Sequence, residues 1–243
     1  MSKTSRVLQP HQTALLLALV ISIVAFLAPA IHAVFLPLVY LNTHLHELCH
    51  AIAAVITGGE VQGISVFADG SGVTPIRGGN AFIEISAGYP GATVIGAGMI
   101  LIGGTPARAR AVLGALAAIL AVSMILWVRE DLVGVISGLA WSAALGAGAC
   151  FLRGGSSLFV CQLVGIQQCV NAVTIIFQLM RISMVTDRAN DALTMQSFTY
   201  VPAVAWASMW CVFSLLMVAL AVRKAWQVLD PKAGAAAGRA GGL

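Results

Sequence analysis

The sequence predicts an all-α polytopic membrane protein with about six or seven transmembrane helices and one short interfacial β-hairpin. Of the 243 residues, 59% are hydrophobic and only 9% are charged, whereas an ordinary soluble domain carries roughly 25% charged residues. Mean hydropathy is +0.94, and the apolar residues gather in long runs that are typical of membrane-spanning helices. This composition excludes a soluble single domain, a disordered chain and a nucleic-acid-binding protein.

The apolar segments are each long enough to cross a bilayer or nearly so, at about 20 residues per span. They cover residues 13–31, 34–57, 84–103, 107–127, 132–151, 157–181 and 200–222. The first two are barely separated, so one of them could be partly re-entrant. We expect residues 13–222 to form one membrane-embedded domain. A polar segment, 1–12, precedes it, and a low-complexity tail, 223–243, is expected to be disordered.

Basic residues account for the net charge of +4. They lie at the ends of apolar segments, as Arg108, Arg129 and Arg223 do, which is the usual place for anchors at lipid headgroups. The basic balance therefore indicates contact with a lipid bilayer and gives no sign of a nucleic-acid partner.

Two stretches interrupt the apolar pattern. Residues 58–82 are rich in glycine and β-branched residues and alternate in polarity, which predicts a β-hairpin with its turn near Asp69-Gly70. Unpaired backbone groups are not tolerated in lipid, so this hairpin must lie at the interface or against protein. Residues 182–199 are the most polar stretch between two late spans.

The second apolar segment contains His46-Glu47-Leu48-Cys49-His50, an HExxH motif. Residues four apart lie on one face of an α-helix, so His46 and His50 can direct two imidazoles at one metal ion. Glu47 lies on the flank of that face, where a carboxylate can take the proton of a water molecule at the metal. The pattern is typical of zinc hydrolases and predicts a Zn²⁺ cofactor.

The membrane setting strengthens the metal hypothesis. A charged side chain in the middle of a membrane helix costs roughly 2.5–3.5 kcal/mol, so two histidines and a glutamate need a compensating partner. A zinc ion is such a partner. The alternative is a polar cluster that lines a cavity or pairs with another helix, as in a proton relay.

A catalytic zinc usually has three protein ligands, and the motif supplies two. The remote candidates for the third are Asp69, Glu84, Asp187 and Asp191. Asp69 and Glu84 have ordinary explanations as a turn residue and a helix N-terminal residue. Either of the other two could supply the ligand. His44 lies about 200° round the helix from His46, so we expect it to be a packing or interfacial histidine.

An HExxH in an apolar segment, followed by Thr57-Gly58-Gly59 and a β-hairpin, resembles the M50 intramembrane metalloproteases. It is most similar to the short M50B-like branch related to site-2 proteases. Further matching elements are Gly72-Val73-Thr74, the SAGYPG sequence at 86–91, which resembles an AGP-type start of the next span, and Asn190-Asp191-Ala192, which resembles a late xDA element. The resemblance covers about residues 34–215, and it lacks the LDG element of site-2 proteases.

The resemblance implies a zinc endopeptidase that hydrolyses peptide bonds in or near transmembrane segments of membrane proteins. Carried over position by position, it makes His46, His50 and Asp191 the zinc ligands and Glu47 the catalytic base. Asn171 would match the family's substrate-orienting asparagine, or it makes an interhelical hydrogen bond. The hairpin is expected to receive an extended substrate by strand addition.

These features predict a multi-pass integral protein of the bacterial cytoplasmic membrane. Its expected partners are the lipid bilayer, a membrane-protein substrate and a regulatory membrane partner that the sequence does not identify. The alternative function is a non-enzymatic metal or proton transporter, or a scaffold that retains its metal. A transporter needs ionisable groups along a path through the bilayer, and the middles of the third to fifth apolar segments contain almost none.

Overall fold

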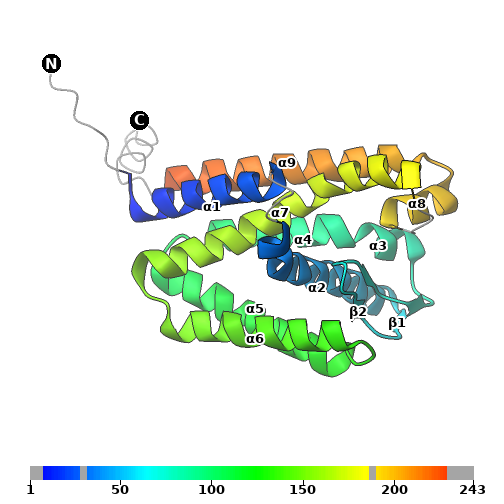
Figure 1. Cartoon of the computed structure of the whole chain (residues 1–243), viewed down its shortest axis with the longest axis horizontal. Coiled ribbons are helices and arrows are strands. Elements are labelled where there is room, and N and C mark those ends of the chain that lie inside the picture. Colours follow the sequence, from blue (N-terminus) through cyan, green and yellow to red (C-terminus); the bar gives the residue numbers. More distant parts are fainter. Residues whose placement is uncertain (1–7, 28–31, 186–189, 229–243) are drawn as a thin grey trace, which may run out of the picture.

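The computed structural model describes residues 8–27, 32–185 and 190–228, and helices dominate it (Figure 1). The helices are α1 (Pro10–Leu27), α2 (His32–Thr57), α3 (Ala81–Ser86), α4 (Gly88–Ile102), α5 (Pro106–Leu126), α6 (Leu132–Phe151), α7 (Gly154–Val185), α8 (Asp191–Thr199) and α9 (Ala203–Val228). Over the described residues, each predicted apolar segment overlaps at least one helix. The prediction of a helical protein with only a small β element is confirmed.

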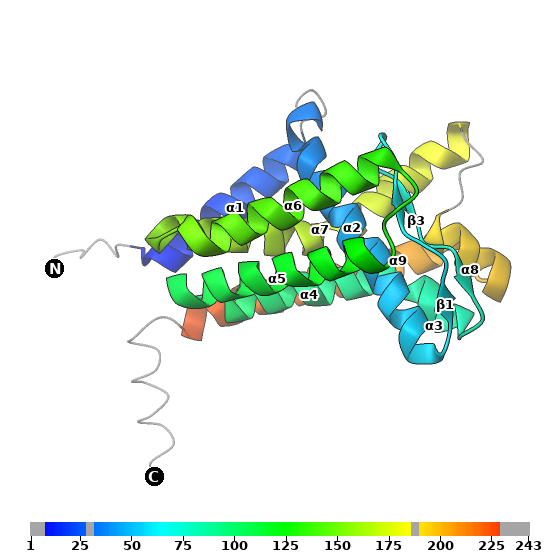
Figure 2. The ribbon, with the colours of Figure 1, turned by 90° about the horizontal axis from the view of Figure 1, so that it is seen from below.

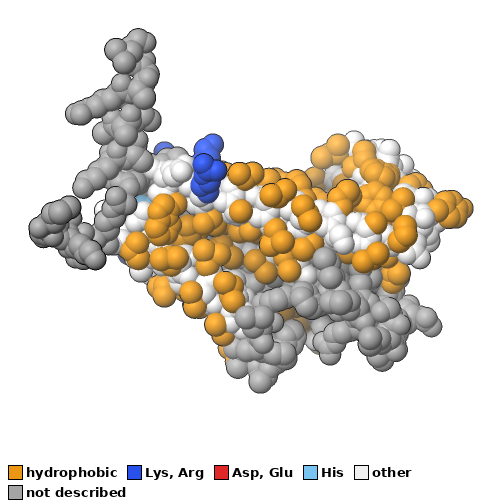
Figure 3. Space-filling model, turned by 90° about the horizontal axis from the view of Figure 1, so that it is seen from above, with side chains coloured by type: hydrophobic (Ala, Val, Ile, Leu, Met, Phe, Trp, Pro, Cys, Tyr) orange, Lys and Arg blue, Asp and Glu red, His pale blue; other side chains and the backbone are white. Residues whose placement is uncertain are grey.

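Three helices, α5, α6 and α9, are long and apolar enough to cross a membrane, judged over the described residues. Shorter apolar stretches occupy Pro10–Val24 in α1 and Gly88–Ile102 in α4. Hydrophobic side chains predominate on the face of the molecule in Figure 3, as expected for a surface in contact with lipid. Membrane-spanning character is therefore supported, and the count of about six or seven spans stays a prediction.

Two of the apolar cores bring most of the long helices together. Helices α5 and α6 lie side by side (Figure 2) and pack with α2 and α7 around residues such as Leu45, Leu113 and Leu145. The second core joins α1, α4, α7 and α9. At the α4–α7 crossing, a Cβ on Gly165 would lie 2.9 Å from the carbonyl oxygen of Gly96, so only small residues allow this approach. Contacts with both α6 and α4 fix the position of α2.

The predicted hairpin is present as two short antiparallel ladders. Strand β1 (Glu60–Val61) pairs with β4 (Ile76–Arg77), and β2 (Ser65–Val66) pairs with β3 (Gly72–Val73). The turn lies where the sequence predicted it: Asp69 Oδ1 accepts a hydrogen bond from the Ser71 amide at 3.1 Å. Gly70 has a φ of +84°, in the region that L side chains rarely adopt.

The hairpin lies between α2 and the loop that joins α5 to α6. On the first arm of the hairpin, residues 60–66, the Ile64 amide donates to the Trp127 carbonyl at 2.9 Å, and the Val66 amide donates to Asp131 Oδ2 at 3.0 Å. These bonds occupy the outer edge of that arm. The hairpin thus lies against protein, one of the two places expected from its sequence.

Three boundaries differ from the sequence expectations. The segment expected as one span at 84–103 is divided at Ala87 into α3 and α4. The polar stretch at 182–199 contains the short helix α8, which begins where Asn190 Oδ1 accepts the Leu193 amide at 3.0 Å. Helix α9 continues to Val228, so the first part of the segment expected to be disordered is helical, and 229–243 lies outside the described residues.

Candidate metal centre

Helix α2 places the HExxH side chains inside the protein. His46, Glu47 and His50 are each less than 10% exposed, because α4 and the hairpin cover this part of α2. The Nε2 atoms of the two histidines lie 3.0 Å apart. The spacing of four residues therefore brings the two imidazoles to one point, as the sequence predicted.

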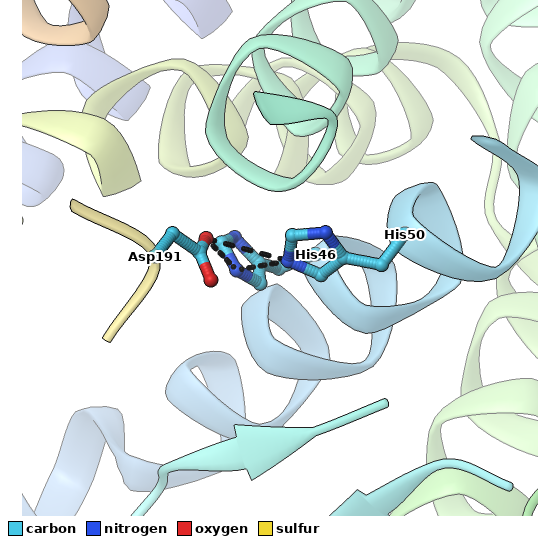
Figure 4. Close-up of side chains that lie close together, drawn as sticks. All are labelled: His46, His50 and Asp191. Atoms are coloured by element: carbon cyan, nitrogen blue, oxygen red, sulfur yellow. Dashed lines mark hydrogen bonds and ion pairs between the residues drawn. The ribbon is translucent and has the colours of Figure 1, made fainter. Parts of the chain in front are cut away.

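Asp191, at the start of α8, completes the cluster (Figure 4). Its Oδ2 lies 2.9 Å from His46 Nε2 and 3.3 Å from His50 Nε2. Helix α8 is held in this place by Ala192 and Met195, which pack against α9. In a tetrahedral zinc site with bonds of about 2.0–2.1 Å, ligand atoms lie about 3.3 Å apart. The three atoms are thus spaced closely enough to share one metal ion.

The orientation of His50 makes its Nε2 available as a ligand. Its Nδ1 lies 2.6 Å from the carbonyl oxygen of Glu84, and a carbonyl can only accept, so Nδ1 carries the proton. The Nε2 lone pair then faces His46 and Asp191. Asp191 Oδ2 is buried, and among the described residues it has no hydrogen-bond donor outside the two rings. The nitrogen and oxygen atoms that meet here are of the types that bind a metal cation.

The charge of Asp191 follows from its surroundings. Burial by itself raises the pKa of the carboxyl, but positive charge on the facing rings of His50 and His46, when they are protonated in the metal-free protein, lowers the pKa below its usual value. The residue is therefore an ionised carboxylate at neutral pH, the form that binds a metal.

Glu47 lies beside the cluster and faces the hairpin. Its Oε2 accepts a hydrogen bond of 2.7 Å from the Thr74 hydroxyl. A Cβ on Gly72 would lie 2.6 Å from Glu47 Oε1, so glycine is required for strand β3 to pass this close. Glu47 is thus a buried carboxylate next to the two histidines on α2, and its Oε2 is held by the hairpin.

The start of α4 forms the opposite wall. A Cβ on Gly88 would lie 2.5 Å from the Nε2 atoms of both His46 and His50, so a side chain at this position would collide with both rings. The Tyr89 ring lies edge-on to the His46 ring at 4.4 Å and stacks on Trp210 at 5.7 Å. This side of the site is therefore bare backbone and aromatic rings.

A family model described as Peptidase M50B-like matches residues 16–221. The chain belongs to the M50B-like peptidase family. The match includes both the HExxH helix and Asp191, and membership of this family indicates a membrane metalloprotease. The resemblance inferred from the motifs is thereby confirmed. No curated protein and no solved structure matched the chain.

The other candidate ligands of this M50B-like peptidase lie away from the cluster or outside the described residues. Asp69 is in the hairpin turn. The Glu84 carboxylate accepts the Thr57 hydroxyl at 2.9 Å, and only its backbone carbonyl reaches the site. Asp187 lies outside the described residues. Asn171 belongs to α7, but its side chain is not among those described, so its role stays a prediction.

His44 is a packing residue in this peptidase. It is buried, and its Nε2 lies 2.9 Å from the Ser137 hydroxyl on α6. The His44 side chain points away from the face of α2 that carries His46, as expected from their separation around the helix. The α2–α6 contact thus accounts for the third histidine of this helix without any metal.

Sequence reasoning missed three contributors to the site of this M50B-like peptidase: the hydroxyl of Thr74, the bare backbone of Gly88 and the carbonyl of Glu84. Thr74 and Gly88 lie in segments that matched the family, but the match gave them no chemical role. Every residue has a backbone carbonyl, so the residue type at position 84 could not indicate this contact. No local signal distinguishes these positions, because their contacts depend on how the hairpin, α3 and α4 pack on α2.

Proposed function

We propose that this M50B-like peptidase is a zinc-dependent endopeptidase that hydrolyses peptide bonds in or near transmembrane segments of membrane-protein substrates. The observation that carries the proposal is the convergence of ligand atoms from His46, His50 and Asp191 within 4.8 Å of one another, beside a buried glutamate. A zinc ion held there would supply Lewis acidity and lower the pKa of a water molecule to about 7.

The side chains divide the remaining tasks. The Glu84 carbonyl keeps the His50 ring in the ligand orientation. The Asp191 carboxylate offsets part of the metal charge in a poorly solvated setting. Glu47 accepts the proton of the attacking water and returns it to the leaving amine. Each task uses an atom that lies in or directly beside the cluster.

The hairpin offers one edge for an extended substrate. The first arm of the hairpin, residues 60–66, is already bonded to the α5–α6 loop through Ile64 and Val66. Among the described residues, no backbone hydrogen bond joins 72–77 to a segment outside the hairpin. We infer that a substrate segment pairs along 72–77, next to Glu47. A helical segment must unwind first, which favours substrates with glycine or proline near the cleavage site.

A reconstitution assay tests the function. The purified protein is placed in liposomes with single-span model substrates, with and without a Gly-Pro pair, and with 1,10-phenanthroline as chelator. We expect cleavage of the Gly-Pro substrate, loss of cleavage on chelation and recovery on addition of zinc. Cleavage by fully metal-free protein would contradict the proposal. Zinc or proton flux without any cleavage would favour the transporter alternative.

The assignment of Asp191 is tested by comparing two aspartates. Asp191→Ala should weaken zinc binding by more than about 100-fold, because loss of even an outer contact in metal sites costs about 10–100-fold. Asp187→Ala should leave the affinity nearly unchanged. Competition with a fluorescent zinc chelator measures both. The reverse result would make Asp187 the third ligand.

A further inference from the structure

The hydroxyl groups of Tyr40, Thr43 and Thr74 form hydrogen bonds between α2 and the hairpin. The Tyr40 hydroxyl donates to the Ala68 carbonyl at 3.0 Å, and the Thr43 hydroxyl donates to the Gly70 carbonyl at 2.6 Å. The third runs the other way, from Thr74 to Glu47. The first two bonds attach the hairpin turn, whereas the third ends on the proposed catalytic base.

The hairpin lies close to both oxygens of the Glu47 carboxylate and forms a hydrogen bond with one of them. The Thr74 hydroxyl lies 2.7 Å from Oε2 and 3.2 Å from the backbone carbonyl oxygen of the same residue. The backbone at Gly72 passes so close to Oε1 that a Cβ there would lie 2.6 Å from it. Glu47 is only 5% exposed, so no bulk water competes for these contacts. A carboxylate without them would be free to turn about its side-chain bonds.

We propose that Thr74 is a positioning residue for Glu47: its hydroxyl holds the carboxylate in the orientation that proton transfer requires. This inference rests on the proposed function and adds to it a dependence of catalysis on the hairpin. Thr74 lies between β3 and β4, in the same arm of the hairpin, 72–77, along which an extended substrate would pair. The same arm of the hairpin would therefore orient the base and bind the segment to be cut.

The test compares two substitutions at position 74. Thr74→Val keeps the shape and removes the hydroxyl, and Thr74→Ser keeps the hydroxyl. We expect Thr74→Val to lower kcat by about 10–100-fold, since small misplacements of reacting groups cost up to about 100-fold. KM and zinc content should stay near wild type. Thr74→Ser should recover kcat to within a few-fold of wild type.

Thr43→Val is the matched control. It removes a neighbouring hydrogen bond between α2 and the hairpin without touching Glu47, so it reports on the loss of hairpin attachment alone. Its kcat should exceed that of Thr74→Val by about 10-fold or more, at a similar melting temperature. Equal kcat in these two variants, or a Thr74→Ser enzyme as slow as Thr74→Val, overturns the inference.

Two further comparisons keep the outcomes separate. If Thr74→Val does not fold, Thr74→Ala against Thr74→Ser makes the same test, and equal turnover in that pair also overturns the role of the hydroxyl. If wild type cleaves and Glu47→Gln does not, while Thr74→Val matches Thr43→Val, only this inference fails. A wild-type protein that binds zinc without cleaving any substrate removes the proposed function and the inference together.

Discussion

Glu47→Gln should keep its zinc and lose nearly all peptide hydrolysis. The amide has the shape of the carboxylate and can still accept the Thr74 hydrogen bond, but it cannot take a proton from water. General acid–base catalysis contributes about 10²–10⁴-fold, so turnover should fall by at least about 100-fold. Metal analysis and the liposome cleavage assay measure the two properties on one preparation.

Cys49→Ala is the control for Glu47→Gln. It changes another residue of the HExxH motif, but the thiol faces Gly91 on α4 and lies outside the cluster. It should keep both zinc and turnover. A Glu47→Gln protein with near wild-type turnover would remove Glu47 from the role of base, and one that loses its zinc would show a structural role instead.

His46→Ala and His50→Ala should each abolish zinc binding. Each removes one of three converging ligand atoms, and a catalytic zinc is normally held by three protein ligands. Each also leaves the Asp191 carboxylate buried with only one ring in contact. The zinc content per chain, measured by mass spectrometry after gel filtration, should fall from about one to about zero, because two ligands rarely hold a zinc ion.

His44→Ala makes the same chemical change two residues away. Because His44 contacts Ser137 and not the cluster, this variant should keep its zinc while its melting temperature falls. Full metal occupancy in His46→Ala or His50→Ala would refute the ligand assignment. Loss of zinc in His44→Ala to the same extent would mean that the metal loss reflects unfolding of α2.

Features that depend on neighbouring residues in the chain could be predicted from the sequence. Long apolar runs gave the helices, the Asp69-Gly70 pair gave the turn, and a spacing of four residues brought His46 to His50. These patterns need only local geometry. The approach of Asp191 required the family resemblance, because nothing local relates residue 191 to α2.

Features that depend on long-range packing were not predictable in the same way. The helix break at Ala87 lies inside a segment that hydropathy indicated as one span. The short helix α8 lies in the polar stretch between two late spans. The positions of Gly88 and Thr74 at the site follow from how α4 and the hairpin approach α2. Such contacts are specified by the whole arrangement of helices, so a single sequence carries no direct sign of them.

The contact between His50 and the carbonyl of Glu84 has a consequence for mutational tolerance. An orienting acceptor supplied by a side chain disappears with one substitution, whereas every amino acid at position 84 would present the same main-chain oxygen. A substitution at position 84 therefore leaves the acceptor that orients His50 in place. The orientation of His50 is vulnerable instead to changes in the path of the chain between the hairpin and α4, such as an insertion, a deletion or a proline that displaces α3.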